Sequence, residues 1–200
     1  MITIGITGTT GAGKTTALHE LEKLGGCIID ADAVYHQLLA SDLDLRKELE
    51  DRFGPMTDGE GNFQRKKLGA IVFADPEAMQ DLNAITHRFI GDAIRSLLDE
   101  AREQGRPAAA IDAIRLFESG LGACCDVTVA ITAPVEVRIH RIMAREGIGE
   151  DYARSRVAAQ KPDSWFVENC DHALVNDCAN PAEFAQKAAA LFESILKKES

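Results

Sequence analysis

Apolar residues recur along the chain with two periods, one typical of strands and one typical of helices. Five short runs are rich in β-branched or small apolar residues, as buried strands are. These runs are Ile2–Thr7, Cys27–Asp32, Ala108–Asp112, Asp126–Thr132 and His172–Val175. Strands that alternate with helical segments predict an α/β fold with a doubly wound five-stranded parallel sheet.

In most of the remaining chain, apolar residues recur at the spacing of a helix. Residues 33–105 contain no clear buried strand, and Pro76–Glu103 fits one long helix or two stacked ones. Pro181–Lys198 is amphipathic and is expected to pack on the sheet. We interpret 33–105 as a helical insertion that covers a second substrate.

The most specific motif lies between the first strand and the first helix. Residues 8–16 read Gly-Thr-Thr-Gly-Ala-Gly-Lys-Thr-Thr, which fits the phosphate-binding pattern of Gly, four residues, and then Gly-Lys-Ser/Thr. Its glycines let backbone N–H groups turn inward around a β-phosphate. A nucleoside triphosphate is therefore the expected ligand. The alternative, a glycine-rich turn with a chance lysine, is disfavoured by the complete motif in its proper context.

The end of this loop adds charge and a metal ligand. Lys14 is expected to reach the β- and γ-phosphate oxygens, and the Thr15 hydroxyl to bind Mg²⁺. The positive end of the following helix contributes to the same anion site. The expected nucleotide-binding residues of the loop are Gly8, Gly11, Ala12, Gly13, Lys14, Thr15 and Thr16.

Acids follow two of the predicted strands. The carboxyl ends of parallel strands face the ligand crevice, so an acid at Asp30 or Asp32 is placed to accept a proton from a substrate hydroxyl and to help organise Mg²⁺. Asp32 is the favoured base. The alternative, that Asp32 is a helix N-cap, can coexist with this role. Asp112 ends an apolar run in a Walker-B-like arrangement and is a candidate Mg²⁺ ligand, although such runs are common.

Cationic residues supply candidates for binding other anions. Arg138, Arg141 and Arg145 recur at spacings of three and four, so we expect them along one helix face, where guanidinium groups suit a transferring phosphoryl group. The alternative is a solvated face paired to Glu136 and Glu146. Within the helical insertion the cationic candidates for an anionic acceptor are Arg65, Lys66, Lys67, His87 and Arg88, with Arg65 and His87 favoured.

Composition narrows the class of protein. The chain has 200 residues, of which 46% are hydrophobic and 27% charged, as in an ordinary globular domain. A formal charge of −10 argues against general nucleic-acid binding. The sequence shows no apolar run long enough for a membrane span and no secretory leader pattern, and its five cysteines form no C-x-x-C pair. We expect a cytoplasmic protein with reduced thiols.

These elements resemble the dephospho-coenzyme A kinase family. The likeness spans nearly the whole chain, and its later elements are more specific than the loop. They are Asp30-Ala31-Asp32, Phe53-Gly54, Arg65 with Leu68 and Phe73, Leu82-Asn83 with His87 and Ile90, Leu116-Phe117-Glu118, Asp126, Arg141 with Arg145, Gln160 and Asn176. The sequence departs from the family pattern by having Arg88 and Ile114-Arg115 where prolines and a leucine are usual.

The resemblance implies a P-loop kinase fold with a nucleotide-binding core, a helical acceptor region and a helical lid. We assign the core to 1–32, 106–135 and 170–200, the acceptor region to 33–105 and the lid to 136–169. The implied reaction is ATP- and Mg²⁺-dependent phosphorylation of the ribose 3′-hydroxyl of dephospho-coenzyme A.

The resemblance also implies roles for single residues. Asp32 would act on the acceptor hydroxyl, while Lys14, Arg141 and Arg145 surround the moving phosphoryl group. Asn176 joins the nucleotide site, and Arg65, His87 and Glu118 join the acceptor site with Asp32. Two alternatives stay open: a kinase of the same architecture for a nucleoside or nucleotide, and a regulatory nucleotide-binding module without turnover. In all three the partners are small molecules, with no nucleic acid and no membrane.

Overall fold

The computed structural model describes residues 1–178 and 180–198. The chain divides into two compact units, one made of residues 1–29 and 98–200 and the other of residues 30–97. The end of the expected core segment, 199–200, and residue 179 within it lie outside the described residues. No helix in the described part of the chain is both long and apolar enough to cross a membrane.

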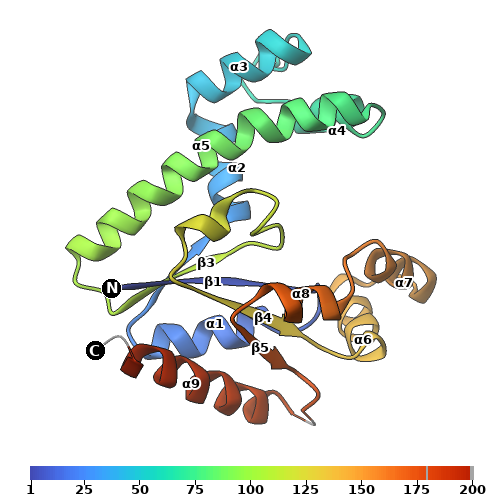
Figure 1. The fold of residues 1–200 in the computed structure, drawn as a ribbon. Helices are drawn as coiled ribbons and strands as arrows, with labels where there is room; N and C mark the ends of the chain where they lie inside the picture. Colours follow the sequence, from blue (N-terminus) through green and yellow to red (C-terminus); the bar gives the residue numbers. More distant parts are fainter. Residues whose placement is uncertain (179, 199–200) are drawn as a thin grey trace. The chain divides into compact units, whose positions relative to one another are not determined.

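A five-stranded sheet forms the centre of the first unit (Figure 1). Its strands are β1 (Ile2–Gly8), β2 (Cys27–Asp30), β3 (Ala108–Asp112), β4 (Val127–Thr132) and β5 (His172–Val175). The spatial order is β2-β3-β1-β4-β5, and β1 pairs in parallel with both β3 and β4 while β4 pairs in parallel with β5. The predicted doubly wound five-stranded sheet is thus confirmed.

Both faces of β1 are buried, which explains its continuous apolar and small-residue run. On one face Ile2, Ile4 and Ile6 join a core completed by helices α1 (Lys14–Lys23) and α9 (Pro181–Lys198), which pack side by side under the sheet (Figure 1). The helix α9 buries Phe184, Ala188, Phe192 and Ile195 there, as its amphipathic pattern predicts.

The other face is closed by the segment that follows β3. A Cβ added to Gly5 would lie 2.7 Å from Leu116 Cδ2 and 2.8 Å from Cys125 Sγ, so these side chains press directly on the strand. The 3₁₀ helix η1 (Leu121–Cys124) and helix α8 (Asp163–Asn169) also contact β1. Helix α8 is a seven-residue element that the sequence pattern did not predict.

Two further helices extend the first unit beyond β4. Helices α6 (Val135–Glu146) and α7 (Glu150–Ala158) pack on each other through a small apolar cluster, Ile139, Ile142, Ala153 and Val157. The segment 136–169, expected to form a lid, therefore consists of α6, α7 and α8 and belongs to the same compact unit as the sheet.

The second unit is helical. It contains α2 (Ala31–Ser41), α3 (Leu43–Phe53), α4 (Arg65–Val72) and most of α5 (Pro76–Glu103), which is one continuous helix. An apolar cluster of its own holds it together: Leu39, Leu45, Leu49, Met56, Leu68, Val72 and Ala78. Residues 58–62 form a tight turn flanked by an antiparallel bridge between Thr57 and Phe63.

The cysteines are free thiols, and all five are partly buried. Burial raises the pKa of Cys125 to about 12 and that of Cys170 to about 11. Because the thiolate is the reactive form, these two thiols are expected to be poor nucleophiles at neutral pH.

The carboxylate of Asp171, beside β4, is expected to make the stability of the protein depend on pH. Asp171 Oδ2 accepts hydrogen bonds from Thr128 Oγ1 at 2.7 Å and Thr128 N at 2.8 Å, and these bonds hold the pKa of Asp171 below its usual range. A lowered folded-state pKa stabilises the protein above the unfolded-state pKa, and this contribution is lost as pH falls through the folded-state value.

We therefore predict that Asp171→Ala lowers the free energy of unfolding by about 1 kcal/mol at neutral pH, because the exposed carboxylate is partly screened by solvent. The difference from the wild type should shrink below about pH 4. Urea unfolding of both proteins across this pH range measures it. Glu168→Gln, at an exposed position, is the matched control. If Asp171→Ala lowered the free energy of unfolding equally at both ends of the pH range, the charge-based explanation would be contradicted.

Candidate active site

The loop between β1 and α1 leaves several backbone amides without a protein acceptor. In the described chain, the N–H groups of Gly11, Gly13 and Thr15 donate to no protein acceptor. Gly13 is the N-cap of α1 and has φ of 107°, in the left-handed region. The helix begins at the next residue, Lys14. Amides without protein acceptors at a helix N-terminus form a ready site for a phosphate group.

Close backbone contact explains the first glycine of the loop. Gly8 has φ of 131°, and a Cβ at this position would lie 1.9 Å from the carbonyl oxygen of Ile131 on β4. Since the same oxygen accepts a hydrogen bond from Thr9 N at 3.3 Å, the loop leaves the sheet in direct contact with its neighbouring strand.

The carbonyl side of the loop is held by two distant side chains. Asn176 is buried, and its Nδ2 donates to Ala12 O at 2.7 Å. Arg141 on α6 donates from Nη1 to Gly11 O at 3.3 Å and to Ala12 O at 3.4 Å, and from Nη2 to Asn176 Oδ1 at 3.3 Å. The structure thus brings two predicted site residues, Arg141 and Asn176, together against the phosphate-binding loop.

Gln160 makes a third contact with the loop, which sequence reasoning did not assign. Its Oε1 accepts from Thr10 N at 3.1 Å, and its Nε2 donates to Thr10 Oγ1 at 2.8 Å. Gln160 follows α7, so the loop is tied to the helical segment after β4 at two points. Gln160 was part of the family resemblance, but only the folded structure reveals this pairing.

The candidate metal ligands lie at the same edge of the sheet. Thr15 is exposed in the first turn of α1, beside the partly buried Lys14 and Thr16. Asp112 ends β3 opposite Ile6 of β1, and Ala113 N donates to Ile6 O at 3.1 Å, which holds the two strand ends together. Among the described residues no cluster of three or more His, Cys, Asp or Glu side chains forms a metal cage.

The three arginines of α6 do not share one environment, although they were expected on one face. Arg138 is buried, with its Nε donating to Ala133 O at 2.9 Å and its Nη2 lying 3.5 Å from Asp163 Oδ1. Arg145 is exposed and pairs with Glu146 at 2.6 Å. Of the three side chains, only that of Arg141 hydrogen-bonds to the loop. Of the two acids in the alternative interpretation, Glu146 pairs with Arg145, whereas Glu136 binds Arg154 of α7 at 2.8 Å instead.

Glu118, a predicted acceptor residue, lies in a second cluster of the first unit. Its carboxylate pairs with Lys161 Nζ at 2.8 Å, and the same ammonium lies 3.4 Å from the ring centroid of Trp165. Burial alone would raise the pKa of Glu118, but the hydrogen bond and charge of Lys161 outweigh it, so the pKa lies below its usual range. Lys161 and Trp165 were not predicted as site residues.

The two acids Asp30, the last residue of β2, and Asp32 have different surroundings. Asp30 is the N-cap of α2, since its Oδ1 accepts from Asp32 N at 2.9 Å and Ala33 N at 3.0 Å. The alternative interpretation of Asp32 as the cap is therefore wrong. Asp32 is exposed in the first turn of α2, so its carboxylate is accessible to a substrate.

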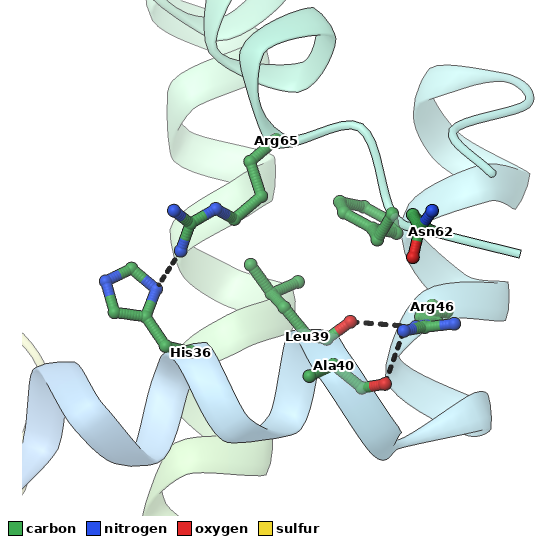
Figure 2. A pocket seen from close by; sticks show the side chains of 7 residues that line it. His36, Leu39, Ala40, Arg46, Asn62 and Arg65 are labelled. Carbon is green, nitrogen blue, oxygen red and sulfur yellow. Dashed lines mark hydrogen bonds between the residues drawn. The ribbon is translucent and has the colours of Figure 1, made fainter. Parts of the chain in front are cut away.

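The favoured cations of the helical insertion are also separated. Arg65 lines a pocket of about 290 Å³ together with His36, Arg46 and Asn62 (Figure 2). His87 is partly buried on α5, outside the residues that line this pocket. The neighbouring Arg88 donates to both carboxylate oxygens of Glu48 at 2.5 Å, so its charge is already paired.

Sequence comparison identifies relatives across most of the chain. The family model described as dephospho-CoA kinase matches residues 2–181. A dephospho-CoA kinase from Dehalococcoides mccartyi is 38% identical over 176 residues, which cover 88% of this chain and 88% of that protein. One from Anaeromyxobacter dehalogenans is 36% identical over 196 residues, covering 98% of this chain and 92% of the relative.

Structural comparison agrees with the sequence comparison. The dephospho-CoA kinase from Campylobacter jejuni superposes with a TM-score of 0.73 at 26% identity, covering 99% of this chain and 98% of that one. A shikimate kinase from Bacteroides thetaiotaomicron, at 16% identity and a TM-score of 0.53, shares the fold alone. With a matching family model and relatives similar over nearly their whole length, this chain belongs to the dephospho-CoA kinase family.

Proposed function

We propose that the protein transfers the γ-phosphoryl group of ATP to the ribose 3′-hydroxyl of dephospho-coenzyme A, giving coenzyme A and ADP. The observation that carries the proposal is the glycine-rich loop with amides that have no protein acceptor, in a chain that matches this family from residue 2 to residue 181. Both proposed substrates are small molecules. Neither nucleic acid nor membrane enters the proposed reaction, and we propose the cytoplasm as its location.

The loop is proposed to bind the triphosphate of ATP. Amides of Gly11, Gly13 and Thr15 donate to phosphate oxygens, and the positive end of α1 favours the same charge. Lys14 adds a point charge at the β- and γ-phosphates. Ala12 and Asn176 keep the loop in this shape, because the Ala12 carbonyl is bound by the Asn176 amide at 2.7 Å on the outer side.

The donor set fits Mg²⁺ bound together with the nucleotide. Thr15 offers one hydroxyl and Asp112 one carboxylate, and Mg²⁺ characteristically takes its other ligands from phosphates and water. When bound, the ion supplies charge neutralisation at the β- and γ-phosphate oxygens.

Asp32 is proposed as the general base that accepts the proton of the attacking 3′-hydroxyl. Two observations support this role. The side chain of Asp30 caps α2, so that of Asp32 is not needed as a cap, and the Asp32 carboxylate is exposed. The neighbouring acid is occupied by two backbone amides, whereas Asp32 can face a substrate. Arg65, His87 and Glu118 are proposed to contact the acceptor.

Arg141 and Arg145 are proposed to stabilise the transferring phosphoryl group. Arg141 already contacts the loop carbonyls and Asn176, which holds its guanidinium beside the loop that is proposed to bind the phosphates. Arg145 must first leave Glu146, a surface pair in which Arg145 is 60% exposed and which therefore costs little to break.

The acceptor is tested by ADP release in a coupled assay with dephospho-coenzyme A, adenosine and a panel of nucleosides and nucleotides. We expect ADP release with dephospho-coenzyme A, and mass spectrometry should show its product with one added phosphate. Release only with a nucleoside or nucleotide would replace the proposal by the kinase alternative. No release with any acceptor, despite ATP binding, would favour a regulatory module.

Asp32→Asn is predicted to lower kcat by about 10²-fold or more, the scale expected for loss of a general base, while ATP binding is retained. Asp30→Asn is the matched control, since asparagine caps a helix as well as aspartate does. Single-turnover rates and nucleotide binding of both variants measure the difference. Turnover that survives in Asp32→Asn would remove Asp32 from the mechanism.

Arg141→Gln is predicted to lower kcat by about 10²-fold, as expected for loss of one preorganised donor to the transition state. The KM for ATP should rise as well, because Arg141 also holds the loop carbonyls. Arg154→Gln, at an exposed arginine of α7 paired with Glu136, is the control and should keep wild-type kinetics. Equal effects of the two substitutions on steady-state kinetics would contradict a specific role for Arg141.

A further inference from the structure

Arg65 is oriented by an uncharged partner. Its Nη1 lies 2.6 Å from His36 Nδ1, and the two side chains point toward each other across the pocket (Figure 2). A guanidinium has donors and no acceptor, so His36 Nδ1 must accept this hydrogen bond. The imidazole is therefore neutral in this arrangement and carries its proton on Nε2.

This partner is unusual among the arginines of the second unit. Arg52 pairs with Asp81, Arg88 with Glu48 and Arg95 with Asp92. In the described part of the chain, no carboxylate lies within ion-pair distance of Arg65. The guanidinium of Arg65 thus keeps its full positive charge, although the whole chain carries a formal charge of −10.

The other arginine of the pocket is already used by the fold. Arg46 donates from Nε to Leu39 O at 2.8 Å and also to Ala40 O (Figure 2). Its Nη1 donates to Gly61 O at 3.2 Å. Leu39 and Ala40 lie in the last turn of α2, where a cation satisfies the terminal carbonyls. Arg46 therefore shapes the wall of the pocket, and Arg65 is the side chain that can bind an anion there.

We propose that His36 is a positioning residue that holds Arg65 to bind the diphosphate of the acceptor. This inference rests on the proposed function. Dephospho-coenzyme A carries one diphosphate, between its nucleoside and its pantetheine arm, and an arginine fork matches phosphate oxygens in geometry and charge. A neutral imidazole orients the fork through one Nη while the remaining N–H groups stay available.

The proposal is tested by a substitution that removes the acceptor atom of His36 and keeps a side chain of similar volume. His36→Leu should raise the KM for dephospho-coenzyme A roughly tenfold, about the effect of one hydrogen bond to a charged group, and leave kcat and the KM for ATP unchanged. His36→Asn should stay near the wild type, because its Oδ1 replaces Nδ1 as the acceptor. Arg52→Ala, at an exposed arginine paired with Asp81, is the control.

A double-mutant cycle separates positioning from a direct contact. Arg65→Ala should raise the acceptor KM at least as much as His36→Leu, and the double variant should match Arg65→Ala alone, since His36 acts through Arg65. Additive effects, a change confined to the KM for ATP, or a His36→Asn variant as impaired as His36→Leu would each overturn the proposal. Thermal unfolding of every variant confirms that the fold is retained.

Calorimetric binding of dephospho-coenzyme A gives a readout that does not need turnover. A wild type that binds and phosphorylates this acceptor, with His36→Leu indistinguishable from it, overturns the role of His36 and leaves the proposed function standing. A wild type that binds it without phosphorylating it, with weaker binding in His36→Leu, supports the positioning role and overturns the proposed function. A wild type that does neither overturns both.

Discussion

A loop that turns its amides toward a ligand must satisfy its carbonyl groups elsewhere. In this protein the carbonyls of Gly11 and Ala12 are bound by Arg141 and Asn176, which lie far from the loop in sequence. Buried carbonyls without partners would cost free energy comparable to lost hydrogen bonds. The shape of the proposed phosphate site therefore depends on other parts of the first unit, because side chains outside the glycine-rich motif bind its carbonyls.

The same requirement couples the loop to the helices after β4. Gln160 binds both the amide and the hydroxyl of Thr10, and the backbone of Arg138 lies close enough to Gly11 that a Cβ there would be 3.0 Å from the Arg138 carbonyl oxygen. Motion of α6 or of the segment after α7 must consequently strain or release the loop. A residue such as Arg141 that supports the loop and is also proposed to meet the phosphoryl group joins nucleotide binding to catalysis.

The sequence predicts the sheet well because its central strands are buried on both faces and so read as short apolar runs. It misses α8, a seven-residue helix whose pattern is too short to show a period. Spacing placed Arg138 and Arg141 on one face, but burial of Arg138 against Ala133 depends on the tertiary fold. The pairing of His36 with Arg65 joins positions 29 apart on different helices, which local patterns do not reveal.

Neutral partners distinguish the arginines that are suited to bind anions. A carboxylate can orient a guanidinium, but it also neutralises the charge that an incoming phosphate would need. Carbonyl, amide and imidazole acceptors orient the same group and leave its charge intact. In the described chain Arg141 and Arg65 are held in this second way, whereas Arg145 is paired with Glu146. This difference favours Arg141 over Arg145 for the proposed contact with the phosphoryl group, and it favours Arg65 for the proposed contact with an anion in the second unit.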